Sequence, residues 1–263
     1  MILENENIII KESDNGIKYL QFKRLLDLGI KHAYTLKTDE IDFSFNQERH
    51  DISYLKLAES LGIERKIIVE PVQTHTDIVL GIDELKTSEE LKDVDGLITN
   101  KTNIAITSKN ADCILFFFYD PKQKVIANVH SGWKGTFKKI AIKTVEKMIK
   151  DYNSKPENIL CFISPSIRKC HFEVDIDVKE MCEEIFEGYD LENIVAVGDI
   201  KDGKQKYMID TVLINKEGLL KIGLKEENII DSDLCSVCYK DEIHSARVEG
   251  EGFQRETAII VLE

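Results

Sequence analysis

One cysteine and one histidine are spaced so that they could act together. An apolar strand from Cys113 to Tyr119 is followed by a turn and a returning strand from Lys124 to His130. If Tyr119 lies opposite Lys124 in this antiparallel hairpin, Cys113 lies opposite His130. Directly opposed residues share a face, with Cβ atoms about 4.5–5.5 Å apart. The sequence therefore predicts a thiolate beside an imidazole at the open end of the hairpin. The preceding residue, Asp112, should face the other way.

His75 is a third candidate for this site, because it lies just beyond another apolar strand that ends near Val72. Two imidazoles and one thiolate suit Zn²⁺, and three protein ligands leave a fourth position for water, as in catalytic zinc sites. The spacings among the three residues match no local zinc motif. The other histidines remain alternative ligands at this stage: His32, His50, His171 and His244.

Each of these residues also has a structural interpretation. A strand cysteine in an apolar run usually packs in the core, and a single histidine at a strand end is usually a surface residue. The turn at residues 131–135 leads from the second strand into a helix. Its free N–H groups and Lys134 favour an anion such as phosphate, although a plain strand-to-helix connection fits the same residues.

Cys235 and Cys238 are separated by two residues, but no second pair or histidine follows at zinc-finger spacing. We therefore favour a structural role or buried thiols over a metal or redox site. Cys161, Cys170 and His171 carry even less signal.

The elements that must position these residues alternate between strands and helices. Strands are predicted at 8–10, 17–22 and 66–72, near Ile78, Leu97 and Ile104, in the central hairpin, and at 159–164, 229–230 and 257–262. Helices are predicted at 55–61, 135–151, 175–186 and 210–222. This order predicts a mixed α/β (α+β) fold, a layered sandwich with mixed sheets and a central antiparallel hairpin. No linker composition interrupts it, so we expect a single domain over residues 1–263.

Composition excludes several classes of protein. The chain has 263 residues, is 43% hydrophobic and carries a net charge of −13, which argues against binding nucleic acids or membrane surfaces. Its longest apolar run, 113–119, falls far short of the roughly 20 residues of a membrane helix. The acidic N-terminus does not resemble a secretion signal, so we expect a cytoplasmic protein with reduced cysteines.

Several blocks together resemble the YfiH-like, laccase-domain family. In order, they are Gln73-Thr-His75, Ala111-Asp-Cys113, His130-Ser-Gly-Trp133, Ser164-Pro-Ser-Ile167 with Cys170-His-Phe-Glu-Val174, and Cys235-Ser-Val-Cys238 with Ser245-Ala-Arg247. The resemblance implies a purine nucleoside phosphorylase that cleaves adenosine, inosine and methylthioadenosine with phosphate and also deaminates adenosine. It also implies that His75, Cys113 and His130 are catalytic and hold one metal ion, which we expect to be zinc rather than copper.

The resemblance also implies contacts to nucleoside or phosphate, which we expect at Lys37, Asn46, Gln73, Ser131, Lys134 and Arg247. Lys37 stands where the family usually has arginine. A lysine is a point charge and cannot reproduce the bidentate fork of arginine, so phosphate affinity or substrate preference is expected to differ. The sequence predicts no particular oligomeric state.

Three other functions compete with this one. A four-copper laccase needs about ten histidines in paired motifs, and this chain has six histidines and no His-x-His, so we reject it. A cysteine hydrolase would use Cys113 as nucleophile and His130 or His75 as base on an amide, as in peptidoglycan-precursor editing. The third is a zinc-stabilised binding module, which chelation would unfold.

Overall fold

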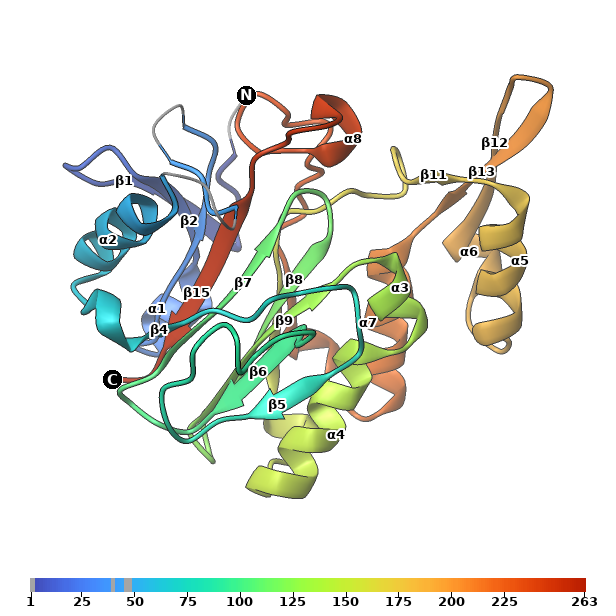
Figure 1. Ribbon diagram of the computed structural model, residues 1–263. Coiled ribbons are helices and arrows are strands. Elements are labelled where there is room, and N and C mark those ends of the chain that lie inside the picture. Colours follow the sequence, from blue (N-terminus) through green and yellow to red (C-terminus); the bar gives the residue numbers. More distant parts are fainter. Residues whose placement is uncertain (1–2, 39–40, 45–48) are drawn as a thin grey trace.

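The computed structural model describes residues 3–38, 41–44 and 49–263, and two six-stranded sheets form its centre (Figure 1). The first sheet has the order β1 (Ile8–Glu12), β2 (Lys18–Phe22), β3 (Lys31–Thr35), β15 (Glu256–Val261), β7 (Ala105–Asn110) and β4 (Ile68–Val69). The second has the order β14 (Ile229–Asp231), β10 (Leu160–Ile163), β8 (Ile114–Asp120), β9 (Val125–Ser131), β6 (Gly96–Thr99) and β5 (Val79–Gly81). A small third sheet contains β11 (Glu173–Val174), β13 (Lys204–Ile209) and β12 (Val195–Lys201).

The helices are α1 (Lys23–Asp27), α2 (His50–Leu61), α3 (Trp133–Phe137), α4 (Ile140–Tyr152), α5 (Ile176–Ile185), α6 (Leu191–Ile194), α7 (Thr211–Lys221) and α8 (Ala246–Glu249). Short 3-10 turns occur at Arg65–Ile67, Pro156–Asn158 and Glu226–Asn228. In the part of the chain that the structure describes, no helix combines the length and the apolar character needed to cross a bilayer.

Alternating apolar side chains stack these elements into layers. In β8, Leu115 and Phe117 pack between the two sheets, whereas Phe116 and Phe118 pack toward α4 and α7. The outer face of the first sheet is covered by α2, through a cluster that includes Tyr54. The predicted mixed α+β sandwich is confirmed. The central strand is buried on both faces because it lies in the middle of this stack.

The central hairpin is also present, but its register differs from the prediction by two residues. His130 pairs with Leu115 rather than with Cys113. Because side chains alternate with a period of two, a shift of two residues keeps Cys113 on the same face of the hairpin as His130. The two residues are diagonal neighbours instead of direct partners.

The turn chemistry explains this shift. Asp120 pairs with Val125, so the loop of the hairpin comprises residues 121–124 instead of the predicted 120–123. Its carboxylate accepts hydrogen bonds from the N–H groups of Lys122 and Gln123 at 2.8 and 3.2 Å. Lys124 has a φ of 51°, a left-handed conformation that a strand residue does not adopt. Strand β9 therefore begins at Val125 and not at the predicted Lys124.

The helix predicted over residues 135–151 is in fact two helices, α3 and α4. They are separated at Lys139, which has a φ of 62°. The break turns the chain so that Phe137 packs with α5 and α7, while Ile140 and the residues after it pack on the second sheet. The apolar spacing continues across the break, so periodicity alone did not reveal it.

The β12–β13 hairpin was not predicted. It projects from the sandwich beside α5 (Figure 1), and its side chains give no strong apolar alternation. Val197 and Ile200 are 74% and 70% exposed. The predicted strand at 66–72 shrinks to Ile68–Val69 because a 3-10 turn replaces its beginning.

Candidate functional site

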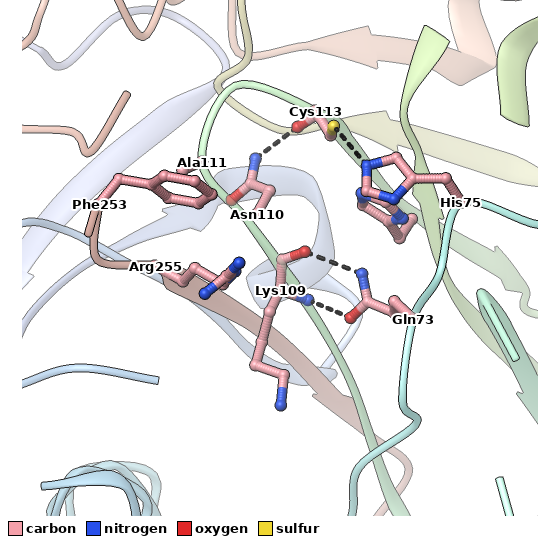
Figure 2. Close-up of a pocket in the computed structure, with 9 residues that line it drawn as sticks. Gln73, His75, Lys109, Asn110, Ala111, Cys113, Phe253 and Arg255 are labelled. Carbon is pink, nitrogen blue, oxygen red and sulfur yellow. Dashed lines mark hydrogen bonds between the residues drawn. The ribbon is translucent and has the colours of Figure 1, made fainter. Parts of the chain in front are cut away.

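The three predicted metal ligands meet at one end of the sandwich. His75 lies in the connection between β4 and β5, Cys113 directly precedes β8, and His130 lies in β9. Their candidate ligand atoms are all within 4.8 Å of one another, and Cys113 Sγ is 3.7 Å from His75 Nε2 (Figure 2). His75 is exposed, Cys113 is half-buried and His130 is buried, so the cluster opens to solvent on one side.

A buried carboxylate, Asp95, supports this cluster from behind. It accepts hydrogen bonds from the backbone N–H groups of Thr74, His75 and Thr76 at 3.3, 3.1 and 2.7 Å, and from the Thr76 hydroxyl at 2.7 Å. Its Oδ1 is also 2.7 Å from Nδ1 of His130. One side chain therefore fixes the backbone of one histidine and the ring of another.

The backbone at His75 requires this support. His75 has a φ of 63°, a left-handed conformation that costs a non-glycine residue about 1–3 kcal/mol. The hydrogen bonds to Asp95 offset that cost, because they satisfy three consecutive N–H groups of the turn. The turn that presents the imidazole is therefore built before any ligand arrives.

Gly132 makes room for the cluster. A Cβ atom at this position would lie 2.6 Å from Cδ2 of His75 and 3.1 Å from Sγ of Cys113. Such contacts are shorter than van der Waals packing allows. The glycine in the His-Ser-Gly-Trp block is thus explained by close approach of two ligand side chains, since its own φ of −67° is ordinary.

Hydrogen bonding sets the protonation of these groups. His130 Nδ1 donates to Asp95, which leaves Nε2 on the side of Cys113, where a metal ion could bind. Burial raises the pKa of the Cys113 thiol, but the charge and hydrogen bonds of His130 and His75 outweigh it and lower this pKa to about 6. Burial lowers the pKa of His130, but the Cys113 thiolate and Asp95 raise it to about 9. Without metal, the pair is a thiolate and an imidazolium at neutral pH.

A cavity of about 330 Å³ opens beside the cluster. Its lining residues are Gln73, His75, Lys109, Asn110, Ala111, Cys113, His130, Phe253 and Arg255. Phe253 and Arg255 lie across the cavity from His75 (Figure 2). The Arg255 guanidinium lies over the Phe253 ring, 4.6 Å from its centroid, and donates to Ser44 Oγ at 3.0 Å. An aromatic face and a cation therefore oppose the metal ligands.

Two other lining residues hold the loops of the site. Gln73 donates to the carbonyl of Lys109 at 2.9 Å and accepts from its N–H at 2.7 Å, which ties the loop of His75 to β7. Asn110 Nδ2 donates to the carbonyl of Cys113, and Asn110 Oδ1 accepts from the Tyr34 hydroxyl at 3.1 Å. The predicted contact residue Gln73 therefore lines the cavity, but its carboxamide is engaged with the main chain.

The other predicted contact residues are dispersed. Ser131 and Arg247 line a smaller cavity on the far side of Cys113, together with Asp112. As predicted, Asp112 faces away from the ligands, and its carboxylate accepts from Ser236 Oγ at 2.6 Å and from the Arg247 N–H at 2.7 Å.

Lys134 is exposed and lies 5.7 Å from the centroid of the Trp133 ring. Lys37 forms an ion pair with Glu249 at 2.9 Å, away from both cavities. Asn46 lies outside the described residues.

Sequence reasoning missed Asp95, Phe253 and Arg255. Asp95 is one acid in an acid-rich stretch, and its role depends on two turns that are distant in sequence. Phe253 and Arg255 reach the cavity from the loop before β15, more than 120 residues after His130. No local pattern marks any of the three.

Residues 45–263 match the family model described as multi-copper polyphenol oxidoreductase laccase. A purine nucleoside phosphorylase of Clostridium acetobutylicum is 30% identical over 257 residues, which cover 96% of this chain and 98% of that protein. Another, from Bacteroides thetaiotaomicron, is 31% identical over 187 residues, which cover 68% of this chain and 67% of that protein.

Two solved structures share the fold. The hypothetical protein YfiH of Bacillus licheniformis superimposes with a TM-score of 0.84 at 23% identity, covering 93% of this chain and 96% of that one. YlmD from Geobacillus stearothermophilus superimposes with a TM-score of 0.80 at 20% identity, covering 97% of this chain and 99% of that one.

Replacing Asp95 should weaken metal binding. In Asp95→Asn, the new NH2 group is a donor and cannot accept hydrogen bonds from the N–H groups that Asp95 binds. The His75 turn and the His130 ring therefore lose their fixed orientation. We expect about 10- to 100-fold weaker zinc binding, measured as the zinc concentration that protects Cys113 from iodoacetamide. Asp93→Asn is the matched control, because Asp93 is exposed, its carboxylate accepts from the Thr74 hydroxyl at 2.8 Å, and its main-chain carbonyl, which the substitution keeps, accepts from the Thr76 hydroxyl. Equal protection in both variants would contradict this role of Asp95.

Gly132→Ala should disrupt the same site through its new methyl group, which would overlap the His75 ring. We expect zinc to lose its protection of Cys113, while circular dichroism shows a folded chain. In Gly135→Ala, the new Cβ would meet its nearest neighbours at 3.4 Å, which is ordinary contact, so protection should persist. A Gly132→Ala protein protected as well as wild type would show that the ligands can move aside.

The reactivity of Cys113 should report its lowered pKa. Because the thiolate is the nucleophile, alkylation in metal-free protein should be half-maximal near pH 6 and decline below it. In His130→Ala, the main interaction that lowers this pKa is lost, so the midpoint should move above about 8. The measurement is the rate of iodoacetamide labelling of the Cys113 peptide by mass spectrometry. A wild-type midpoint near 9 would refute the thiolate–imidazolium pair.

Proposed function

We propose that this chain, which belongs to the family described as multi-copper polyphenol oxidoreductase laccase, is a purine nucleoside phosphorylase that also deaminates adenosine. Its proposed substrates are adenosine, inosine, methylthioadenosine and phosphate. The names of its relatives support the phosphorylase activity. The observation that carries the proposal is the cluster of His75, Cys113 and His130 on the wall of a cavity that Phe253 and Arg255 face.

Zinc is the metal that the donor set fits best. One thiolate and two imidazoles are typical zinc ligands, and three protein ligands with solvent on the fourth side describe a catalytic site. The Asp95–His130 hydrogen bond is the carboxylate–histidine contact that commonly supports zinc ligands. When bound, zinc lowers the pKa of a water molecule, which is the chemistry that deamination at C6 of adenine requires.

Arg255 is the proposed phosphate contact. Its planar guanidinium can bind two phosphate oxygens at once, and it enters the cavity, whereas Lys37 is paired with Glu249. In phosphorolysis, a phosphate oxygen forms a bond to the anomeric carbon as the bond to the purine breaks, and the purine leaves with that electron pair and takes a proton. Held phosphate makes this step effectively unimolecular.

Phe253 is the proposed base contact, because an aromatic ring provides a flat apolar surface for a purine. The Arg255 guanidinium lies over the same ring, so the base and phosphate positions are adjacent. A cavity of about 330 Å³ falls within the 300–1,000 Å³ range typical of small-molecule sites.

The placement of the histidines disfavours multi-copper chemistry. Among the described residues, the two clusters that could hold a metal ion contain at most two histidines each. His32 is buried in the core, where its Nε2 accepts from the N–H of Phe22 at 2.7 Å, and His244 pairs with Glu249.

A cysteine hydrolase is the second candidate, and one observation favours it. Asp95, His130 and Cys113 are arranged as an orienting acid, a base and a thiolate nucleophile, which is the pattern of cysteine-dependent amide hydrolysis. The two candidates differ in what Cys113 does. A zinc ligand is shielded from alkylation in zinc-loaded protein, whereas a free nucleophile reacts.

Product analysis tests the proposal. Zinc-loaded protein is incubated with inosine or adenosine, with and without phosphate, and the products are separated by chromatography. We expect hypoxanthine from inosine only with phosphate, and inosine from adenosine without phosphate. Arg255→Ala should lower kcat/KM for phosphate about 10- to 100-fold, because a charge-assisted contact is lost, with deamination little changed.

Arg255→Lys is the matched variant and should retain an intermediate phosphorolysis rate, since it keeps the charge but loses the fork. Equal losses of both activities in Arg255→Ala would contradict the phosphate role of Arg255. No product under any condition, with rapid alkylation of Cys113 in zinc-loaded protein, would favour the hydrolase. Unfolding on chelation would favour a zinc-stabilised binding module.

A further inference from the structure

A second cluster of metal-binding side chains lies outside the cavity beside the first. It contains Cys170, His171, Cys235 and Cys238, whose ligand atoms all lie within 4.8 Å of one another. The spacing of Cys235 and Cys238 favours a structural role or buried thiols, because no partner lies at zinc-finger spacing. The structure supplies partners that the spacing did not indicate, because Cys170 and His171 lie in a loop about 65 residues earlier.

The fold itself brings the two loops together. Strands β10 and β14 are parallel neighbours, so the loops that follow them leave the same edge of the second sheet. Main-chain pairing continues past the strands, with the Ser166 N–H donating to Leu234 at 3.2 Å and the Ser236 N–H donating to Ser166 at 3.0 Å. Arg168 adds a bidentate ion pair with Asp231 at 2.8 and 2.9 Å. The ligands are therefore held together by contacts that do not depend on an ion.

The distances match a tetrahedral ion. Zinc binds Cys sulfur at about 2.3 Å and His nitrogen at about 2.0–2.1 Å, which places ligand sulfurs about 3.8 Å apart and sulfur about 3.6 Å from nitrogen. Here Cys170 Sγ is 3.6 Å from Cys235 Sγ and 3.9 Å from Cys238 Sγ. His171 Nδ1 is 3.2, 3.6 and 3.6 Å from the sulfurs of Cys170, Cys235 and Cys238.

We propose that Cys170, His171, Cys235 and Cys238 form a second, structural zinc site. Four protein ligands close the coordination sphere, so this site leaves no position for a substrate, unlike the three-ligand cluster at His75. A disulfide fits the group less well, because three sulfurs can form only one bond and His171 Nδ1 faces all three. Cys161 and Cys182 are buried elsewhere and belong to neither cluster.

The site would brace one wall of the catalytic region. Arg247 donates to the carbonyl of the ligand His171 at 3.1 Å, and its N–H donates to Asp112, the neighbour of Cys113. The Ser236 hydroxyl, between the ligands Cys235 and Cys238, donates to the same carboxylate at 2.6 Å. The loop of Cys235 and Cys238 therefore contacts Asp112 directly, and the loop of Cys170 and His171 is linked to Asp112 through Arg247.

Zinc content tests the proposal. Protein loaded with zinc and then desalted is analysed by mass spectrometry for metal per chain. We expect two zinc ions in wild type, one in Cys238→Ala, one in Cys113→Ala and none in the double variant. Cys182→Ala is the control for losing a cysteine outside both clusters and should keep two. Circular dichroism confirms folding, and His171→Ala replaces Cys238→Ala if the latter does not fold.

Thiol mapping provides a second readout on the wild-type chain. Cys170 and Cys238 are exposed, so iodoacetamide should label both faster after chelation than in zinc-loaded protein. In Cys238→Ala, zinc should still protect Cys113, which separates the two sites. These readouts do not depend on nucleoside chemistry, so this proposal can fail while the proposed function stands, and the reverse. Two zinc ions per chain in Cys238→Ala, iron in place of zinc, or a disulfide among these cysteines would overturn the proposed second zinc site.

Discussion

The candidate site depends on the buried carboxylate of Asp95. It accepts three consecutive N–H groups of the turn that carries His75 and orients the His130 ring through Nδ1. Burial opposes its charge, but these hydrogen bonds and the charge of His130 outweigh burial and lower the pKa of Asp95. Because one anion holds the main chain of His75 and the ring of His130, the protein scaffold positions both histidines without a bound ion.

The sequence was most informative where local chemistry and periodicity decide the structure. The buried strand and the mixed sandwich followed from residue types and spacing. The hairpin pattern brought Cys113 and His130 together, whereas the family resemblance singled out His75 from the other histidines. The predicted hairpin register was wrong by two residues, because Asp120 still pairs in the strand and the turn begins after it. Cys113 and His130 nevertheless share a face, since two residues are one full period of a strand. A one-residue error would have separated the ligands.

The rest depended on contacts between segments that are far apart in the chain. Asp95, Phe253 and Arg255 acquire their roles only when loops from three different connections converge, and no spacing rule encodes that convergence. The same holds for Cys235 and Cys238, whose partners follow a different strand of the same sheet. The break at Lys139 was hidden for another reason, because a single left-handed residue redirects a helix without changing the apolar pattern on either side.

The positions of the ligands along the chain have a mechanical consequence. His75 and Cys113 both lie on segments that cross from the first sheet to the second, between β4 and β5 and between β7 and β8, while His130 belongs to the second sheet alone. An ion bound by His75, Cys113 and His130 would link these two connecting segments to strand β9 of the second sheet. The separation of the two sheets at this end would therefore set the geometry around the ion. A change that moves the sheets apart would also move the three candidate ligands apart.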